Sequence, residues 1–250
     1  MAKSSFEELI AVGERADVTG WDFSWLAGRA TEERPSWGYA ARLAERLGRA
    51  QASLDIQTGG GEVLAEAESF PPTAVATESW PPNVLAATRR LHPRGVVVVA
   101  HPDEPPLPFA DAAFDLVSSR HPATVWWEEI ARVLRPGGTY FAQHVGPRSA
   151  FELIEFFLGP RESGGRDPRD EVKAAQAAGL EIVDLRTART QIVINDVAAV
   201  VYLLRKVIWW VPGFTVEQYR SQLHDLHDRI EREGRFVTYS TRHLIEARRQ

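Results

Sequence analysis

Apolar residues change their spacing repeatedly along the chain, and each change predicts a new strand or helix. The valine run at residues 95–100 is bounded by Gly and Pro, which is typical of a strand buried on both faces. Similar patterns predict strands at residues 53–57, 73–78, 114–119 and 139–145, and helices at 61–68, 81–91 and 124–134. Strands that alternate with helices at this spacing predict a parallel sheet with right-handed crossovers.

The two ends of the chain follow a different pattern. Ser5 and Glu8 form a capping-box pattern that predicts a first helix, and apolar residues at helical spacing predict another at 37–47. Beyond residue 146, the pattern predicts helices at 150–158, 171–178, 197–210 and 216–233, a strand at 181–186 and a last strand within 235–247. The helices between the last two strands are expected to form a lid.

Together these elements predict an α/β fold with a doubly wound, mostly parallel sheet of seven strands and helices on both faces. We expect a single domain over residues 1–250. It would consist of an N-terminal helical cap at 1–50, a ligand-binding core at 51–146 and a C-terminal part at 147–250, with the lid helices within 195–233.

Composition narrows the class of protein. The 250 residues are 44% hydrophobic and 25% charged, which is enough apolar material for a large core. A net charge of −5 makes a nucleic-acid partner unlikely, since such binding relies on Lys and Arg neutralising phosphates. The chain has no cysteine, so disulfides and Cys-ligated metals are excluded.

No segment predicts a membrane or a secretory route. Residues 1–14 lack the basic and apolar stretches of a signal peptide. The longest apolar run, residues 197–211, is interrupted by Arg205 and Lys206 and is too short to span a bilayer. We therefore expect a buried helix there and a cytoplasmic protein.

The segment Leu-Asp-Ile-Gln-Thr-Gly-Gly-Gly-Glu at residues 54–62 joins a predicted strand to a predicted helix. Its glycines allow the backbone to turn sharply and to approach a ligand closely. Glu78 stands at the end of the next predicted strand, where a carboxylate can accept both hydroxyls of a ribose. Dinucleotide sites and S-adenosylmethionine sites both use this plan, and a tight turn without a ligand would have the same sequence.

One position separates the two kinds of site. A dinucleotide fingerprint requires Gly or Ala three residues after its second glycine, and this chain has Leu64 there. Tyr202 and Lys206 imitate the catalytic pair of short-chain dehydrogenases, but they lie in the predicted lid, where a chance pairing on a helix is the simpler interpretation. A pyrophosphate site is therefore disfavoured.

Four segments occur in one order across residues 50–146: LDIQTGGGE, ATESWPPNVL, AHPDEPPLPFADAAFDLVSSRH and IARVLRPGGTYFAQHVG. This set resembles class I S-adenosylmethionine-dependent methyltransferases, especially the small bacterial ones. The resemblance implies a Rossmann-like fold and S-adenosylmethionine as cofactor, with S-adenosylhomocysteine as its product.

The resemblance also implies roles for individual residues. Asp55 and the backbone of Thr58, Gly59 and Gly61 would face the methionine part of the cofactor. The ribose would lie at Glu78 with Ser79 beside it, and the adenine at Asp103, Glu104 and the stretch that begins with Leu107. Ser119 and Arg120 would end the fourth strand beside the methyl-transfer centre. Gln57 departs from the family, which usually has glycine there, and its side chain could crowd or hydrogen-bond the methionine moiety.

Methyl transfer from a sulfonium mainly requires that the acceptor atom be aimed and water excluded, so catalytic residues are hard to recognise. His121 and His144 follow or end strands at the carboxyl edge of the sheet, where open α/β sheets bind ligands. Either could take a proton near neutral pH. The alternatives are a loop cap for His121 and a packing role for His144.

The chain has eight tryptophans, and aromatic side chains can line a pocket for an apolar or planar acceptor. Trp37, Tyr39 and Trp209 lie in segments that commonly form the acceptor pocket in the resembled family. For any single one of them, filling of the core is the competing interpretation.

We expect no metal site. The run at residues 224–228 carries His and Asp at helical spacing, but its leucines repeat on one helix face and leave the polar residues solvated. The predicted function is methyl transfer from S-adenosylmethionine to O, N or C of a small molecule. The alternatives are an RNA-modifying methyltransferase, a non-catalytic cofactor-binding member and an NAD(P)-type oxidoreductase. The sequence specifies neither the acceptor nor the oligomeric state.

Overall fold

The computed structural model describes residues 5–162 and 164–250. They form two compact units. The larger unit comprises residues 35–146, 166–188 and 242–250, and the smaller unit comprises the remaining described residues. Strands β7 (Leu180–Ile194) and β8 (Phe236–Arg249) each contribute residues to both units.

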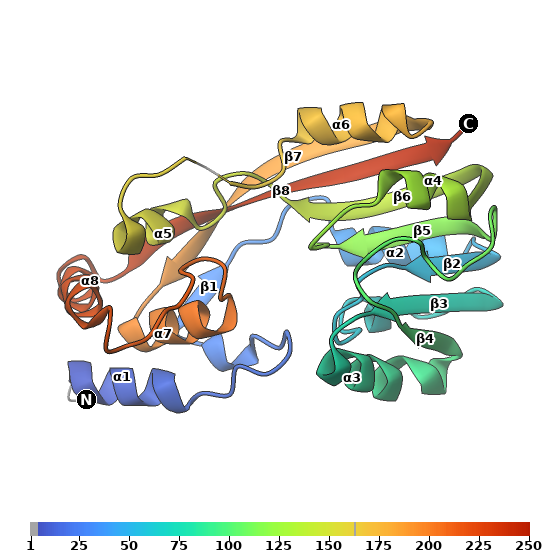
Figure 1. The fold of residues 1–250 in the computed structure, drawn as a ribbon. Helices are drawn as coiled ribbons and strands as arrows, with labels where there is room; N and C mark the ends of the chain where they lie inside the picture. Colours follow the sequence, from blue (N-terminus) through green and yellow to red (C-terminus); the bar gives the residue numbers. More distant parts are fainter. Residues whose placement is uncertain (1–4, 163) are drawn as a thin grey trace. The chain divides into compact units, whose positions relative to one another are not determined.

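The larger unit is built on a mostly parallel sheet (Figure 1). Its strands lie in the order β7-β8-β6-β5-β2-β3-β4. The parallel strands are β2 (Ala52–Asp55), β3 (Thr73–Glu78), β4 (Val96–Ala100), β5 (Phe114–Arg120) and β6 (Leu134–Val145). Strand β8 pairs antiparallel with β6. After β2 the chain adds β3 and β4 on one side of β2 and then β5 and β6 on the other. The carboxyl ends of β2, β3 and β5 therefore frame the crevice where such sheets bind ligands.

Helices cover both faces of this sheet. On one face lie α4 (Trp127–Val133) and α6 (Pro168–Ala177), and on the other lie α2 (Tyr39–Leu47) and α3 (Pro81–Leu91). Neighbouring strand residues alternate between the two cores: Tyr140 packs with α4, whereas Phe141 packs with α2. This alternation follows from the two-residue period of a strand.

The smaller unit is mostly helical. It contains α1 (Phe6–Arg15), α5 (Phe151–Leu158), α7 (Val197–Lys206) and α8 (Arg220–Glu233). The short strand β1 (Ala30–Glu32) pairs antiparallel with the end of β7. The predicted capping box of α1 is present, since Ser5 N donates to Glu8 Oε2 at 2.8 Å and Glu8 N donates to Ser5 Oγ at 3.4 Å. Helix α7 is buried over nearly its whole length.

The predicted fold class is confirmed, with three corrections. The valine run at residues 95–100 forms the edge strand β4, in which Val97 is 54% exposed, so the expectation of burial on both faces is wrong. The sheet has eight strands rather than seven, because residues 30–32 add an edge strand. The predicted helix at 61–68 is wrong: only a 3₁₀ turn forms at Leu64–Glu66. The adjoining glycines carry a high entropic cost in a helix, which explains why the turn does not extend.

Several boundaries also moved. Helix α4 begins at Trp127 instead of residue 124, and β6 begins at Leu134, with residues 135–138 forming a bulge between the pairs Phe114–Leu134 and Leu116–Thr139. The two helices expected between the last strands are α7 and α8. Among the described helices, none is long and apolar enough to cross a membrane.

Close contact between α1 and α7 depends on Gly13. A Cβ added to Gly13 would lie 2.8 Å from Ala198 O and 2.8 Å from Val201 Cβ. We predict that Gly13→Ala destabilises the protein by about 1–3 kcal/mol, because crowding outweighs the gain of roughly 1 kcal/mol in helix propensity. Urea unfolding measures this. Gly48→Ala is the control, since its nearest contact would be an ordinary 3.6 Å; equal stability of both variants would contradict the prediction.

Candidate functional site

Two buried carboxylates stand at the ends of neighbouring parallel strands. Asp55 ends β2, and its Oδ1 accepts a hydrogen bond of 2.5 Å from Ser118 Oγ on β5. Burial raises the pKa of Asp55 to about 6, and the bond from Ser118 offsets part of that rise. At neutral pH the carboxylate is therefore ionised at an energetic cost. Among the described residues no Lys, Arg or His forms an ion pair with it.

Glu78 ends β3 and fixes the glycine loop. Its Oε2 accepts from the amide of Gly59 at 2.7 Å, and its Oε1 accepts from the amides of Ser79 and Trp80 at 3.0 Å each. Glu78 is buried, and in the described part of the chain it too has no cationic partner. Two such carboxylates suit a ligand with a positive charge and hydroxyl groups.

Other residues predicted for the cofactor gather at the same edge. Partial desolvation and the charge of nearby Glu78 raise the pKa of Asp103, while a hydrogen bond from Ser79 opposes the shift; the Asp103 residue as a whole is exposed. Leu107 is buried in the core beneath α4, and its amide donates to Glu129 Oε2 at 2.6 Å. Glu104 is exposed.

Gln57 has a positive φ of 57°, as glycine commonly does. Its side chain turns to the loop after β5: Oε1 accepts from the Ala123 amide at 2.5 Å and Nε2 donates to Thr124 O at 2.9 Å. Gly61, with φ +76°, allows close packing on α3, because a Cβ there would lie 2.8 Å from Leu91 Cδ1. Thr58 joins the loop to β3 through its amide, which donates to Thr77 O at 2.9 Å.

His121 follows Arg120, the last residue of β5, and its amide donates to Gln143 O at 2.7 Å. Burial, with the nearby cations Arg120 and Arg242, lowers the pKa of His121 well below its ordinary 6.5, so the ring is neutral at pH 7. Its Nε2 lies 3.0 Å from Gln143 Nε2.

Trp37 determines which tautomer His121 adopts. Its indole Nε1 donates to Gln143 Oε1 at 2.7 Å, so the amide nitrogen of Gln143 must be the donor to His121 Nε2. The His121 proton therefore resides on Nδ1. Both Trp37 and Tyr39 are buried, and Tyr39 donates to Ser119 O at 3.0 Å while stacking on Phe141.

Trp209 belongs to the smaller unit, where its side chain is 60% exposed. Its ring centroid lies 5.6 Å from that of Trp21, which is also exposed. Tyr202 is buried in the same unit and donates to Asp22 O at 2.9 Å, and Lys206 donates to Val18 O at 3.4 Å. These bonds give the dehydrogenase-like pair a structural role.

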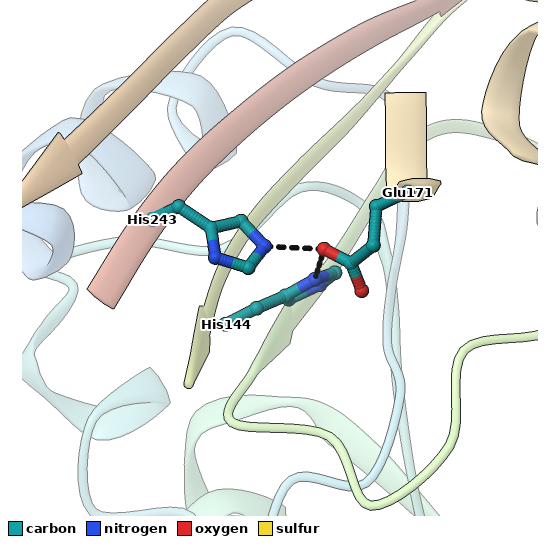
Figure 2. Close-up of side chains that lie close together, drawn as sticks. All are labelled: His144, Glu171 and His243. Carbon is teal, nitrogen blue, oxygen red and sulfur yellow. Dashed lines mark hydrogen bonds and ion pairs between the residues drawn. The ribbon is translucent and has the colours of Figure 1, made fainter. Parts of the chain in front are cut away.

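His144 lies in a buried polar cluster with Glu171 and His243, drawn in Figure 2. His144 and His243 are direct partners on β6 and β8, and Glu171 stands in the first turn of α6. His144 Nδ1 lies 2.7 Å from Glu171 Oε2, and His243 Nε2 contacts the same oxygen. Burial alone would raise the pKa of Glu171, but the bonds from both imidazoles hold it at about 2.

The cluster continues to the end of β5. Burial lowers the pKa of His144, although Glu171 opposes the shift, so a neutral His144 donates from Nδ1 and accepts at Nε2 from the Tyr140 hydroxyl at 3.0 Å. The Tyr140 hydroxyl in turn lies 2.8 Å from Ser119 Oγ. Arg166 Nε, 3.3 Å from Glu171 Oε1, balances the carboxylate charge.

The cluster could also hold a metal ion, since the ligand atoms of His144, Glu171 and His243 lie within 4.8 Å of one another. The mutual hydrogen bonds occupy Glu171 Oε2 and the Arg166 charge lies beside Oε1, while His243 Nδ1 is buried without a hydrogen-bond partner in the described part of the chain. The expectation of no metal stays a prediction. Sequence reasoning missed Glu171, His243, Tyr140 and Gln143, because no local spacing links positions so far apart in the chain.

Comparisons with known proteins match one segment of the chain to a family model and its fold to solved structures. Residues 54–142 match the family model described as "Methyltransferase domain". The solved structure of a protein from Bacillus halodurans C-125 superposes with a TM-score of 0.60 at 18% identity, covering 84% of this chain and 97% of that one. A geranyl diphosphate methyltransferase in complex with S-adenosylmethionine superposes with a TM-score of 0.51 at 15% identity, covering 84% of each chain.

A methyltransferase of assigned activity is similar to this chain in sequence. The malonyl-[acyl-carrier protein] O-methyltransferase of Hahella chejuensis (strain KCTC 2396) is 29% identical over 174 residues, which is 67% of this chain. The match spans 60% of that relative's length. Residues 54–142 therefore resemble a methyltransferase domain, and S-adenosylmethionine, the cofactor in the geranyl diphosphate methyltransferase complex, has the positive charge and hydroxyl groups that suit the two carboxylates described above.

The raised pKa of Asp55 predicts that its ionised form lowers the free energy of unfolding, although the same charge suits a positively charged ligand. Because the pKa is about 6 in the folded chain against 3.8 as the ordinary value, protonation favours the folded state, and stability rises as pH falls from 8 towards 4. Asp55→Asn should therefore stabilise the protein at pH 8, by up to about 3 kcal/mol, and by much less at pH 4.

Thermal unfolding by circular dichroism at both pH values measures this effect. Asp225→Asn, on the exposed face of α8, is the control. A variant that is less stable than the parent at pH 8 would contradict the buried, unpaired state of Asp55.

Proposed function

We propose that this chain transfers the methyl group of S-adenosylmethionine to a small-molecule acceptor by in-line displacement. The observation that carries the proposal is the pair of buried carboxylates, Asp55 and Glu78, for which no described residue supplies a cationic partner, at the edge of the sheet where such folds bind ligands. A bound sulfonium cofactor supplies an activated methyl group, so the protein mainly positions the reactants and excludes water.

We propose that different residues contact different parts of the cofactor. Asp55 would attract the positively charged methionine part, with the backbone of residues 58–61 around it. Glu78, held by three amide donors, would accept from the ribose hydroxyls, and Ser79 and Asp103 lie beside it. Glu104 and Leu107 would border the adenine, while Ser119 and Arg120 would border the transferring methyl group.

We propose different roles for the two histidines. His121 would donate a hydrogen bond from Nδ1 to the methyl acceptor, because its Nε2 already accepts a hydrogen bond from Gln143. His144 is completely buried and would act as a positioning residue through Tyr140 and Ser119, without touching the substrate.

Aromatic residues are the candidates for contact with the acceptor. Trp37 and Tyr39 support the end of β5, and exposed aromatic side chains of the smaller unit offer an apolar surface: Trp21, Phe23 and Trp209. We propose that Trp37 and Tyr39 help to shape the acceptor site in the larger unit. The relative from Hahella chejuensis acts on a malonyl group attached to a carrier protein, so a malonyl thioester belongs in the first panel of acceptors tested.

Removal of the Glu78 charge tests the cofactor assignment. Glu78→Gln should weaken S-adenosylhomocysteine binding about 10- to 100-fold, because charge-assisted hydrogen bonds to the ligand and loop contribute about 1.5–3 kcal/mol. Isothermal titration calorimetry measures the affinity.

Glu66→Gln is the matched control at an exposed position and should bind as the parent does. Equal affinities of the parent and Glu78→Gln, or no binding by the parent at millimolar ligand, would reject the assignment. Release of S-adenosylhomocysteine in the presence of an acceptor then distinguishes catalysis from binding alone.

A further inference from the structure

Two residues with unfavourable backbone conformations face each other at neighbouring strand ends. Gln57 follows β2 and His121 follows β5, and both have a φ of 57°. The two strands pair in parallel, with Asp55 opposite Ser118. A side chain other than Gly pays of order 1 kcal/mol in this region, and it stays there only where its surroundings hold it.

The Gln57 amide provides one of these restraints. Its oxygen accepts from Ala123 N at 2.5 Å and its nitrogen donates to Thr124 O at 2.9 Å. The side chain thus binds two backbone groups of the loop at residues 121–124, as a neighbouring strand would. Glycine at position 57 would permit the same backbone but would leave both groups without these bonds.

Arg166 provides a second restraint from the opposite direction. Its Nη2 donates to Ala123 O, so both backbone groups of Ala123 are occupied. Its Nε lies 3.3 Å from Glu171 Oε1. Glu171 is in turn fixed by His144 and His243, which gives this buried cluster a mechanical role: it anchors the arginine that holds the loop.

We propose that Gln57 and Arg166 are positioning residues that clamp the 121–124 loop as a rigid wall beside the methionine end of the cofactor. This inference rests on the proposed function. A loop fixed before binding loses no further conformational entropy when ligands arrive, and it keeps His121 directed and water out. The clamp accounts for the start of α4 at Trp127, since residues 123 and 124 are bonded elsewhere.

Hydrogen exchange tests the clamp directly. In Gln57→Gly and Gln57→Asn, which tolerate the positive φ but cannot reach the loop, exchange of the amides of residue 121 and residues 123–126 should rise at least fivefold. Gln57→Glu keeps an acceptor for Ala123 N but loses the donor to Thr124 O, and it should give an intermediate rise. Arg166→Ala should also raise exchange, whereas Arg169→Ala, 85% exposed in its side chain, is the matched control.

The release rate of S-adenosylhomocysteine, measured by stopped flow, tests the role of the wall. We expect release to become at least tenfold faster in Gln57→Gly, with a melting temperature close to that of the parent. Unchanged exchange at residues 121–126 would overturn the clamp, and faster exchange with unchanged release would overturn its role at the cofactor. If the parent itself binds no S-adenosylhomocysteine, the proposed function fails, while the exchange data still decide whether the clamp exists.

Discussion

The position of β2 between β3 and β5 is the constraint on which the site depends. Parallel pairing of β2 with both neighbours aligns their carboxyl ends, and the chain leaves β2 for opposite sides of the sheet. Asp55, Glu78 and Ser118 are brought together in this way, although they are far apart in sequence. Every polar contact of the candidate cofactor site, including that between Gly59 and Glu78, depends on this register.

Polar burial at this edge has a cost that ligand binding can offset. Asp55 is buried without a cation, and Gln57 and His121 hold unfavourable backbone conformations. The cluster around Glu171 contrasts with Asp55, because Arg166 already balances its charge and two imidazoles contact its Oε2. We therefore expect Asp55, whose charge is not balanced, to contact a ligand. The cluster around Glu171, whose charge is balanced, is expected to support the loop.

Strand and motif patterns predicted the sheet, because apolar and β-branched runs with clear boundaries mark its strands. The valine run at residues 95–100 predicted a strand correctly but not its burial, since β4 lies at the edge of the sheet and Val97 is 54% exposed. The same local reasoning failed at 61–68, where it weighted apolar spacing above the cost of the glycines. It also noted Gln57 without finding its partners, since Ala123 and Thr124 approach it only after β2 and β5 pair. The cluster of His144, Glu171 and His243 depends in the same way on strand pairing and helix docking, which no single segment encodes.

The most direct measurement is a crystal structure of the full chain with S-adenosylhomocysteine bound. The account predicts both ribose hydroxyls within hydrogen-bond distance of the Glu78 carboxylate, the methionine part beside Asp55, and the bonds from Gln57 to Ala123 and Thr124 retained. A ligand bound elsewhere, or one that leaves Asp55 and Glu78 without contact to it, would contradict the account.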